Sequence, residues 1–170
     1  MSSMNKPIRS WKLRKPFGKI LISLADVDDK IVLLIGDNGY GIFDEFVRKY
    51  PDRIFNLGLR EQSMVGVAAG MALSGLKPYV YTITPFLVER AFEQVKLDID
   101  QQNVNVKLVG YADYPDQGPT HTEVLTKDIC DKIFVNIRTF APKTEGEVVD
   151  AVMLSYTQKF PTFISLKRLK

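Results

Sequence analysis

The sequence has 170 residues, of which 45% are hydrophobic and 25% charged, and its formal net charge is +3, which is typical of one soluble globular domain with its own core. Its basic residues are scattered except at the two ends, so we expect no nucleic-acid binding. No stretch approaches the roughly 20 apolar residues of a membrane span, so we expect no membrane binding. The N-terminus lacks the basic-then-apolar order of a signal peptide. One cysteine and one histidine exclude an intrachain disulfide and a multi-histidine metal site, so we expect a cytoplasmic protein with no metal site of its own.

Apolar strand patterns alternate with helical patterns along the chain. We interpret residues 1–10 as a flexible arm and residues 11–170 as one domain. In the first half we expect, in chain order, helix 15–27, strand 31–36, turn 37–41, helix 43–50, strand 54–56, helix 60–74 and strand 79–83. In the second half we expect helix 86–102, strand 105–111, polar loop 112–121, a helix ending near residue 130, strand 133–137, helix 144–158 and strand 161–166.

This alternation, with unbroken apolar strands such as residues 31–36, predicts an α/β fold. The expected form is a doubly wound, mainly parallel sheet of about six strands with helices on both faces. Ligands of such sheets bind beyond the carboxyl ends of the strands. Residues 37–41, 57–61, 84–86 and 111–121 all follow predicted strands, so we expect the functional site to be built from them.

Residues 54–75, IFNLGLREQSMVGVAAGMALSG, are the most distinctive stretch. A short strand leads through a turn at Leu57-Gly58 into a helix rich in glycine and alanine, with Glu61 in its first turn. An acidic residue there also complements the helix dipole, so Glu61 has a structural interpretation beside a catalytic one. Glycine costs about 1 kcal/mol relative to alanine inside a helix. Gly66 and Gly70 therefore suggest that another backbone approaches this helix closely.

The pattern N-x-G-[IL]-x-E-Q-x-M-x-G-x-A-x-G-x-A resembles the pyrimidine-binding domain of transketolase-like, thiamine-diphosphate-dependent enzymes. This family includes 1-deoxyxylulose-5-phosphate synthase and the beta subunits of 2-oxoacid dehydrogenases, and the resemblance runs from about Trp11 to about Lys167. It implies that Glu61 hydrogen-bonds the aminopyrimidine ring nitrogen of thiamine diphosphate and promotes the imino tautomer that removes the thiazolium C2 proton. A carboxyl group in an apolar slot resists ionisation and can share a proton with a ring nitrogen.

The resemblance also assigns cofactor contacts outside this stretch. In Gly36-Asp37-Asn38-Gly39, which is not a P-loop because no Gly-Lys-[Ser/Thr] follows, it places Asp37 near the thiazolium. For Asn38 an Asx-type turn is an equal alternative. In TPFLVERAFEQV it places Phe86 against the aminopyrimidine, where the alternative is ordinary core packing, with Arg90 and Phe92 lining the site or an interface.

The substrate side of the site is implied by Gly118-Pro119-Thr120-His121, which matches the G-P-T-H of transketolases. The match implies that His121 donates a proton to a substrate oxygen or stabilises negative charge there, beside the alternative of a hydrogen-bonded structural histidine. Gln117 replaces the aspartate usual before this motif, and Ala141 replaces a phosphate-gripping arginine. Arg14 matches another arginine that reaches phosphate, and a surface charge at a helix start is the equal alternative.

The resemblance finally implies a partner. In the family the cofactor lies between a pyrophosphate-binding and a pyrimidine-binding domain of different protomers, and this sequence resembles only the second. We therefore expect a separately encoded pyrophosphate-binding subunit that holds Mg²⁺, in a homodimer or heterotetramer packed through helices 60–74 and 86–102. The expected reaction is ketol transfer between sugar-like substrates. The alternatives are a deoxyxylulose-synthase-like or 2-oxoacid-dehydrogenase-like carboligase or decarboxylase, or a non-catalytic binding module.

Overall fold

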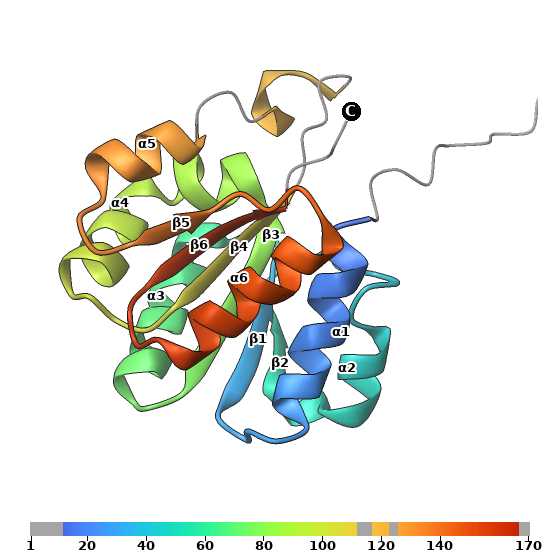
Figure 1. Cartoon of the computed structure of the whole chain (residues 1–170). Coiled ribbons are helices and arrows are strands. Elements are labelled where there is room, and N and C mark those ends of the chain that lie inside the picture. The colour runs from blue at the N-terminus through green and yellow to red at the C-terminus, as the bar shows by residue number, and fades with distance from the viewer. Residues whose placement is uncertain (1–11, 112–116, 123–125, 167–170) are drawn as a thin grey trace, which may run out of the picture.

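The computed structural model of the chain describes residues 12–111, 117–122 and 126–166. Across these residues six strands form one sheet in the order β2-β1-β3-β4-β6-β5, and every neighbouring pair is parallel (Figure 1). Ile31 pairs with Lys77, and Lys107 pairs with both Tyr79 and Thr162. The predicted parallel sheet of about six strands is confirmed. Its strands are β1 (Ile31–Ile35), β2 (Ile54–Asn56), β3 (Lys77–Ile83), β4 (Lys107–Tyr111), β5 (Arg138–Phe140) and β6 (Thr162–Leu166).

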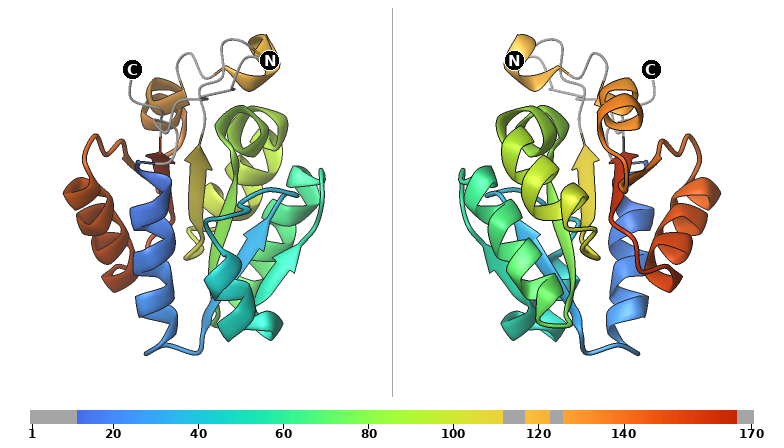
Figure 2. Two further views of the ribbon diagram at one scale, coloured as in Figure 1. Left: turned by 90° about the vertical axis from the view of Figure 1, so that its right-hand side faces the viewer. Right: turned by 90° about the vertical axis from the view of Figure 1, so that its left-hand side faces the viewer.

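Helices cover both faces of the sheet, as the doubly wound fold requires (Figures 1 and 2). One face carries α1 (Arg14–Ala25), α2 (Asp44–Lys49) and α6 (Glu145–Thr157). The other face carries α3 (Glu61–Leu73), the consecutive segments η3 (Phe86–Arg90), α4 (Phe92–Gln94) and η4 (Val95–Gln101), and α5 (Thr126–Ile133). The short segments η2 (Pro51–Arg53) and η6 (Pro119–His121) complete the described elements.

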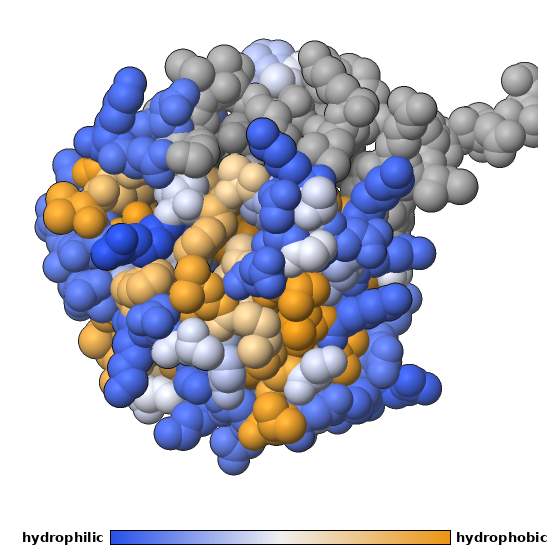
Figure 3. All heavy atoms as spheres, viewed as in Figure 1, coloured by the Kyte–Doolittle hydropathy of each residue, from blue (hydrophilic) through white to orange (hydrophobic). Residues whose placement is uncertain are grey.

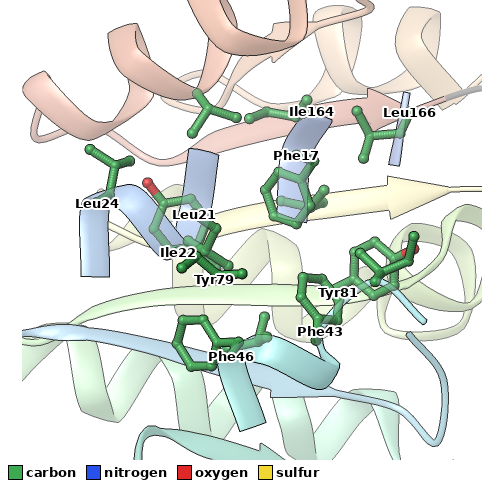
Figure 4. Packing of buried hydrophobic residues seen from close by; sticks show 14 of the residues in the cluster. Phe17, Leu21, Ile22, Leu24, Phe43, Phe46, Tyr79, Tyr81, Ile164 and Leu166 are labelled. Carbon is green, nitrogen blue, oxygen red and sulfur yellow. The ribbon is translucent and has the colours of Figure 1, made fainter. Parts of the chain in front are cut away.

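The hydrophobic core has two layers because alternate residues of each buried strand face opposite sides of the sheet. On the α1 and α6 side, the rings of Phe17 and Tyr81 stack with centroids 5.9 Å apart, and Phe43 meets Tyr81 edge-on at 4.8 Å (Figure 4). On the α3 side, Leu34 and Val80 contribute to the second layer. Both layers are buried, so the sheet is packed on its two faces and supports the residues at its carboxyl edge.

The strand order reverses next to β1. The chain passes from β1 to β2 on one side and then returns to β3 on the other side, so β1 and β3 flank a topological switch point. Ligands of doubly wound sheets bind in the crevice at such points. The segment 117–122, which contains η6, lies beyond the same carboxyl edge (Figure 2). The predicted site stretches therefore share one edge of the sheet as far as the structure describes them.

The predicted helix 86–102 is not one continuous α-helix. It consists of the π-helical segments η3 and η4 on either side of α4, with a break at Ala91. Its fully buried apolar residues recur every four positions, and a four-residue repeat drifts by about 40° per step around an α-helix of 3.6 residues per turn. The wider π turns compensate for this drift and keep the repeat on one face. The repeat consists of Leu87, Ala91, Val95 and Ile99.

The predicted strand 133–137 is wrong. Helix α5 continues to Ile133, and the neighbouring strand β5 begins only at Arg138. The buried Asp100 carboxylate accepts hydrogen bonds from the backbone N–H groups of three successive residues, Val135, Asn136 and Ile137, at 2.8–3.1 Å. These donors are therefore satisfied by a side chain of η4 instead of a neighbouring strand. The other predicted helices and strands are confirmed within about two residues at their described ends, except that the helix predicted to end near residue 130 ends three residues later.

Some expectations lie outside the described residues. These are the arm 1–10, residues 112–116 of the polar loop and the C-terminal residues 167–170. In the parts of the chain that are described, no helix is long and apolar enough to cross a membrane. Hydrophobic residues are interspersed with hydrophilic ones on the face seen in Figure 3, which is common on globular domains. Helix α6 itself carries partly exposed apolar residues, including Met153 and Leu154.

Candidate active site at the carboxyl edge of the sheet

Glu61 is held at the carboxyl edge by the turn after β2. The Asn56 Oδ1 atom accepts hydrogen bonds from the N–H groups of Gly58 at 3.0 Å and Asp37 at 2.9 Å, which joins the turn after β2 to the turn after β1. Gly58 has φ of 68°, a conformation that favours glycine, and the chain then enters α3 at Glu61. The Glu61 side chain has no exposed surface. The turn therefore places a fully buried carboxylate at the start of α3.

The two carboxylate oxygens of Glu61 differ in their surroundings. Oε2 accepts a hydrogen bond from Arg90 Nη1 at 3.0 Å. Oε1 is buried and has no hydrogen-bond partner among the described residues. Buried polar atoms are nearly always hydrogen-bonded, and the exceptions require an explanation such as a ligand or a catalytic role. Glu61 therefore has one oxygen engaged within the chain and one that can accept a hydrogen bond from a ligand.

Arg90 and Phe86 together connect Glu61 to His121. The Arg90 guanidinium lies 3.9 Å from the centroid of the Phe86 ring, and the His121 ring meets Phe86 edge-on with centroids 4.9 Å apart. The π turn of η3 brings Phe86 and Arg90 to the same side, four residues apart. His121 Nδ1 lies 3.0 Å from Thr120 Oγ1. Four predicted site residues, Glu61, Phe86, Arg90 and His121, thus form one continuous series of contacts.

Asn38 bridges the two strands at the switch point. Its Nδ2 atom donates to the Gly36 carbonyl at 2.8 Å and to Thr82 Oγ1 at 3.0 Å, so it connects β1 with β3. Its Oδ1 atom is buried and accepts no hydrogen bond from any described residue. This oxygen is a second acceptor available to a ligand. Thr82, a buried polar residue in a central strand, is a site neighbour that the sequence analysis missed, and its hydroxyl between apolar strand residues is the signal that could have identified it.

Asp37 is exposed and adopts a left-handed backbone conformation with φ of 53°. The Tyr40 hydroxyl donates to Asp37 Oδ1 at 3.1 Å, and this hydrogen bond, together with the carboxylate charge, raises the pKa of Tyr40. Non-glycine residues with positive φ are uncommon and cluster at functional sites. Asp37 lies at the carboxyl edge of the sheet, next to Asn38, as predicted. It takes no part in the contacts that join Glu61, Arg90, Phe86 and His121.

The two remaining predicted substrate residues are located differently. Arg14, the first residue of α1, is only 8% exposed, and its guanidinium lies 4.6 Å from the centroid of the Tyr111 ring at the carboxyl end of β4. This burial contradicts the alternative of a surface charge for Arg14. Gln117 is exposed beside η6, four residues before His121. Among the described residues, the hydrogen bond and the ring contacts that link Glu61 to His121 run through Arg90 and Phe86. These contacts do not involve Arg14 or Gln117.

The two glycines of α3, Gly66 and Gly70, make no close contact with another described backbone. Among the described residues, a side chain added at Gly70 would meet nothing within 4 Å, and one added at Gly66 would meet only Asp98 Oδ2 at 3.7 Å. Val67, between them, is 41% exposed. The face of α3 that carries Gly66, Val67 and Gly70, its small-residue face, is therefore accessible, and the packing of another subunit against it stays a prediction.

The arrangement can bind a flat, polar ring. Glu61 Oε1 and Asn38 Oδ1 can accept hydrogen bonds from a ligand, Phe86 supplies an aromatic surface, and an imidazole such as that of His121 can act as an acid or base. Among residues 12–111, 117–122 and 126–166, no group of three or more histidine, cysteine, aspartate or glutamate residues could hold a metal ion. The chain is an α/β domain whose candidate site lies at the carboxyl edge of a doubly wound sheet, where ligands of this class of fold bind.

Comparisons with known proteins identify the family. A model described as "Transketolase, pyrimidine binding domain" matches residues 9–170. The chain is 38% identical over 124 residues to a subunit of the apulose-4-phosphate transketolase of Actinobacillus succinogenes, covering 71% of this chain and 40% of that protein. It is 38% identical over 143 residues to 1-deoxy-D-xylulose-5-phosphate synthase of Aquifex aeolicus, covering 79% of this chain and 22% of that protein.

A solved structure described as "Split gene transketolase, inactive beta4 tetramer" is similar with a TM-score of 0.83 at 28% identity, covering 92% of this chain and 51% of that chain. The chain belongs to the transketolase pyrimidine-binding domain family. It spans about half or less of the length of each of these three relatives. The predicted family and the predicted pyrimidine-type fold are confirmed.

Proposed function

We propose that this chain is the pyrimidine-binding subunit of a split transketolase-like enzyme, in which Glu61 activates thiamine diphosphate for transfer of a ketol unit between sugar-like substrates. The proposal rests mainly on the Glu61 carboxylate. It is fully buried, and its Oε1 atom has no hydrogen-bond partner among the described residues. A carboxylate oxygen in this state is suited to a ligand nitrogen that carries or shares a proton.

The residues at the edge fit thiamine diphosphate. Glu61 would bind the aminopyrimidine ring nitrogen, and Phe86 and Arg90 would line the ring, while Asp37 would lie on the thiazolium side. The buried Asn38 Oδ1 atom, which no described residue hydrogen-bonds, adds an acceptor for an amino group. The bound cofactor would supply a carbon nucleophile that attacks a carbonyl group.

The substrate would approach from the side of His121. In this proposal His121 donates a proton to a substrate oxygen or stabilises its negative charge, because the His121 ring lies beside Phe86, which would line the cofactor ring. Gln117 and Arg14 would contact the sugar-like part, and the buried position of Arg14 next to Tyr111 supports a role at this edge. Gln117 would give a hydroxyl preference different from that of an aspartate.

The proposal includes a separately encoded pyrophosphate-binding subunit, which would hold Mg²⁺ and complete the cofactor site. The assembly would be a homodimer of this chain or a heterotetramer with two copies of each subunit. One relative is named as one subunit of a transketolase and another is described as a split-gene protein, which supports this division. The exposed small-residue face of α3 offers a surface on which a second subunit can pack closely.

A second candidate function is a deoxyxylulose-synthase-like carboligase. The observation in its favour is the 38% identity to a 1-deoxy-D-xylulose-5-phosphate synthase over 79% of this chain. The two functions differ in the donor substrate, which would be a ketose for ketol transfer and pyruvate for the carboligase.

A reconstituted enzyme tests both functions. The chain is co-expressed with a candidate pyrophosphate-binding subunit, and turnover is measured with a panel of ketose donors and with pyruvate. We expect turnover with ketoses, and turnover with pyruvate alone would favour the carboligase. Glu61→Ala should lower turnover by orders of magnitude. Unchanged turnover in this variant would favour a non-catalytic binding module.

A further inference from the structure

Arg90 contacts Glu61 and Phe86, the two residues that would bind the cofactor ring in the proposed function. Its Nη1 atom donates to Glu61 Oε2 at 3.0 Å, and its guanidinium lies 3.9 Å from the centroid of the Phe86 ring. The Arg90 side chain is 43% exposed, whereas that of Glu61 has no exposed surface. Arg90 therefore reaches from the surface of η3 over Phe86 to a carboxylate that solvent does not contact.

This contact determines which carboxylate oxygen remains available. With Oε2 engaged by Arg90, only Oε1 lacks a hydrogen-bond partner among the described residues. A guanidinium forms directional hydrogen bonds in a fixed plane, so it restricts rotation of the carboxylate more than a point charge does. The position of the guanidinium over the Phe86 ring in turn restricts its movement.

The same contact compensates a buried charge. A carboxylate without exposed surface is costly unless a cation or hydrogen bonds compensate it, and without them it takes up a proton or turns towards water. Arg90 is the ion-pair partner of Glu61 in the described parts of the chain. The π turn of η3 positions it for this contact, and π turns occur frequently at functional sites.

We infer that Arg90 is a positioning residue, which fixes the Glu61 carboxylate through Oε2 so that Oε1 is presented to the aminopyrimidine of the cofactor. This inference rests on the proposed function. Arg90 acts through Glu61, and its own guanidinium takes no part in proton transfer. The opposite role would be competition, in which Arg90 occupies the place of the ring on Phe86 and obstructs cofactor binding.

Two substitutions at Arg90 separate these roles in the enzyme reconstituted with its pyrophosphate-binding subunit. Arg90→Met removes the charge but keeps an unbranched side chain that can cover Phe86. Arg90→Lys keeps the charge but loses the planar fork. We expect Arg90→Met to lower kcat, and also the rate at which the thiazolium C2 proton of thiamine diphosphate exchanges with solvent, by roughly tenfold to a hundredfold. This is the range found when a residue that orients a metal ligand is removed. The KM for thiamine diphosphate should change less, and Arg90→Lys should restore part of kcat.

Arg53 provides the matched control. Its guanidinium lies 3.7 Å from the centroid of the Tyr50 ring and donates to the carbonyls of Asp28 and Ala25, away from the site. Arg53→Met should lower thermal stability without lowering C2 proton exchange at a temperature where the variant is folded. An equal loss of exchange in Arg53→Met and Arg90→Met would overturn the inference. So would a lower KM for thiamine diphosphate with unchanged kcat in Arg90→Met, because that is the result of competition.

A measurement on the isolated chain does not depend on turnover. In NMR spectra of the ¹⁵N-arginine-labelled chain, the Arg90 guanidinium should rotate slowly about its Nε–Cζ bond in the wild type and rotate faster in Glu61→Gln. The rotation of the Arg53 guanidinium should be the same in both proteins. Freely rotating Arg90 signals in the wild type would contradict the inference. If Glu61→Gln keeps wild-type turnover in the reconstituted enzyme, the proposed function itself fails. If Glu61→Gln is inactive and Arg90→Met is fully active, only the role of Arg90 fails.

Discussion

The carboxyl and amino ends of the sheet each hold an ion pair around a poorly exposed carboxylate, but the two carboxylates are satisfied to different degrees. At the amino end, Asp28 accepts hydrogen bonds from Lys77 Nζ at 2.6 Å, Tyr156 Oη at 3.1 Å and the Lys30 N–H at 3.0 Å. At the carboxyl end, Glu61 accepts one from Arg90, and its Oε1 atom has no partner in the described parts of the chain.

This difference separates groups that stabilise the fold from groups that are available for chemistry. Although burial opposes the shift, the hydrogen bonds from Lys77, Lys30 and Tyr156 lower the pKa of Asp28. A carboxylate satisfied in this way contributes to stability at neutral pH. A buried carboxylate oxygen without a partner costs stability, and such costs are typical of functional sites. The amino end therefore supports the fold, and the carboxyl end is assigned to function.

The largest effect is expected for Glu61→Gln. Glutamine keeps the size and the hydrogen-bonding capacity of the side chain but cannot carry the negative charge or share a carboxyl proton. Turnover of the reconstituted enzyme should fall by about 10²- to 10⁴-fold, the range for loss of a general acid–base group. Steady-state kinetics at saturating cofactor measures this. A turnover close to that of the wild type would remove Glu61 from the chemistry.

A smaller effect is expected for His121→Ala. Because His121 is assigned to the substrate oxygen, kcat should fall by roughly tenfold to a thousandfold, as after removal of one group that stabilises charge. Cofactor affinity should change little, since the ring meets Phe86 only edge-on. Kinetics and cofactor titration on the same preparation separate the two. Lost cofactor binding with normal turnover at saturation would contradict the assignment.

The stability of the two ends should respond in opposite ways. Asp28→Asn weakens a satisfied ion pair and should lower the free energy of unfolding by about 1–3 kcal/mol. Glu61→Gln removes an incompletely satisfied buried charge and should leave that free energy unchanged or higher. Urea denaturation at pH 7 gives both values. A larger loss for Glu61→Gln than for Asp28→Asn would mean that the comparison of the two ends is wrong.

The smallest effect concerns Lys107 at the amino end. Burial and, to a smaller extent, the charge of Lys77 lower the pKa of Lys107 to about 7, and its Nζ atom donates to the carbonyls of Gln158 and Phe160. The unfolded chain binds the proton more tightly, so stability rises with pH from about 7 up to the unfolded pKa near 10.4. Between pH 7 and 8 the wild type should gain on the order of 1 kcal/mol relative to Lys107→Met. Parallel denaturation curves at the two pH values test this.

The comparison also explains what the sequence could predict. Apolar strands and the turn residues after them are local signals, so the parallel sheet and the position of Glu61 at its carboxyl edge could be predicted. The contact of Arg90 with Glu61 joins residues 29 positions apart and depends on a π turn. Local periodicity carries no signal for such a contact.

The wrong strand 133–137 has a similar cause. Its apolar residues fit a strand, but Asp100, more than 30 positions earlier, accepts the hydrogen bonds of their backbone. The burial of Arg14 likewise depends on Tyr111, which is distant in the sequence. Tertiary hydrogen bonds and stacking contacts of this kind override local propensity.

The central claim is that this chain supplies the pyrimidine-binding half of a cofactor site completed by another subunit. Isothermal titration calorimetry with thiamine diphosphate and Mg²⁺ tests it most directly, first on the isolated chain and then on the chain mixed with its pyrophosphate-binding partner. We expect no tight binding to the isolated chain, because the cofactor diphosphate needs Mg²⁺ held by oxygen ligands and half a cleft excludes water poorly. Affinity and turnover should appear together on mixing. Binding in the micromolar range by the isolated chain would contradict the claim.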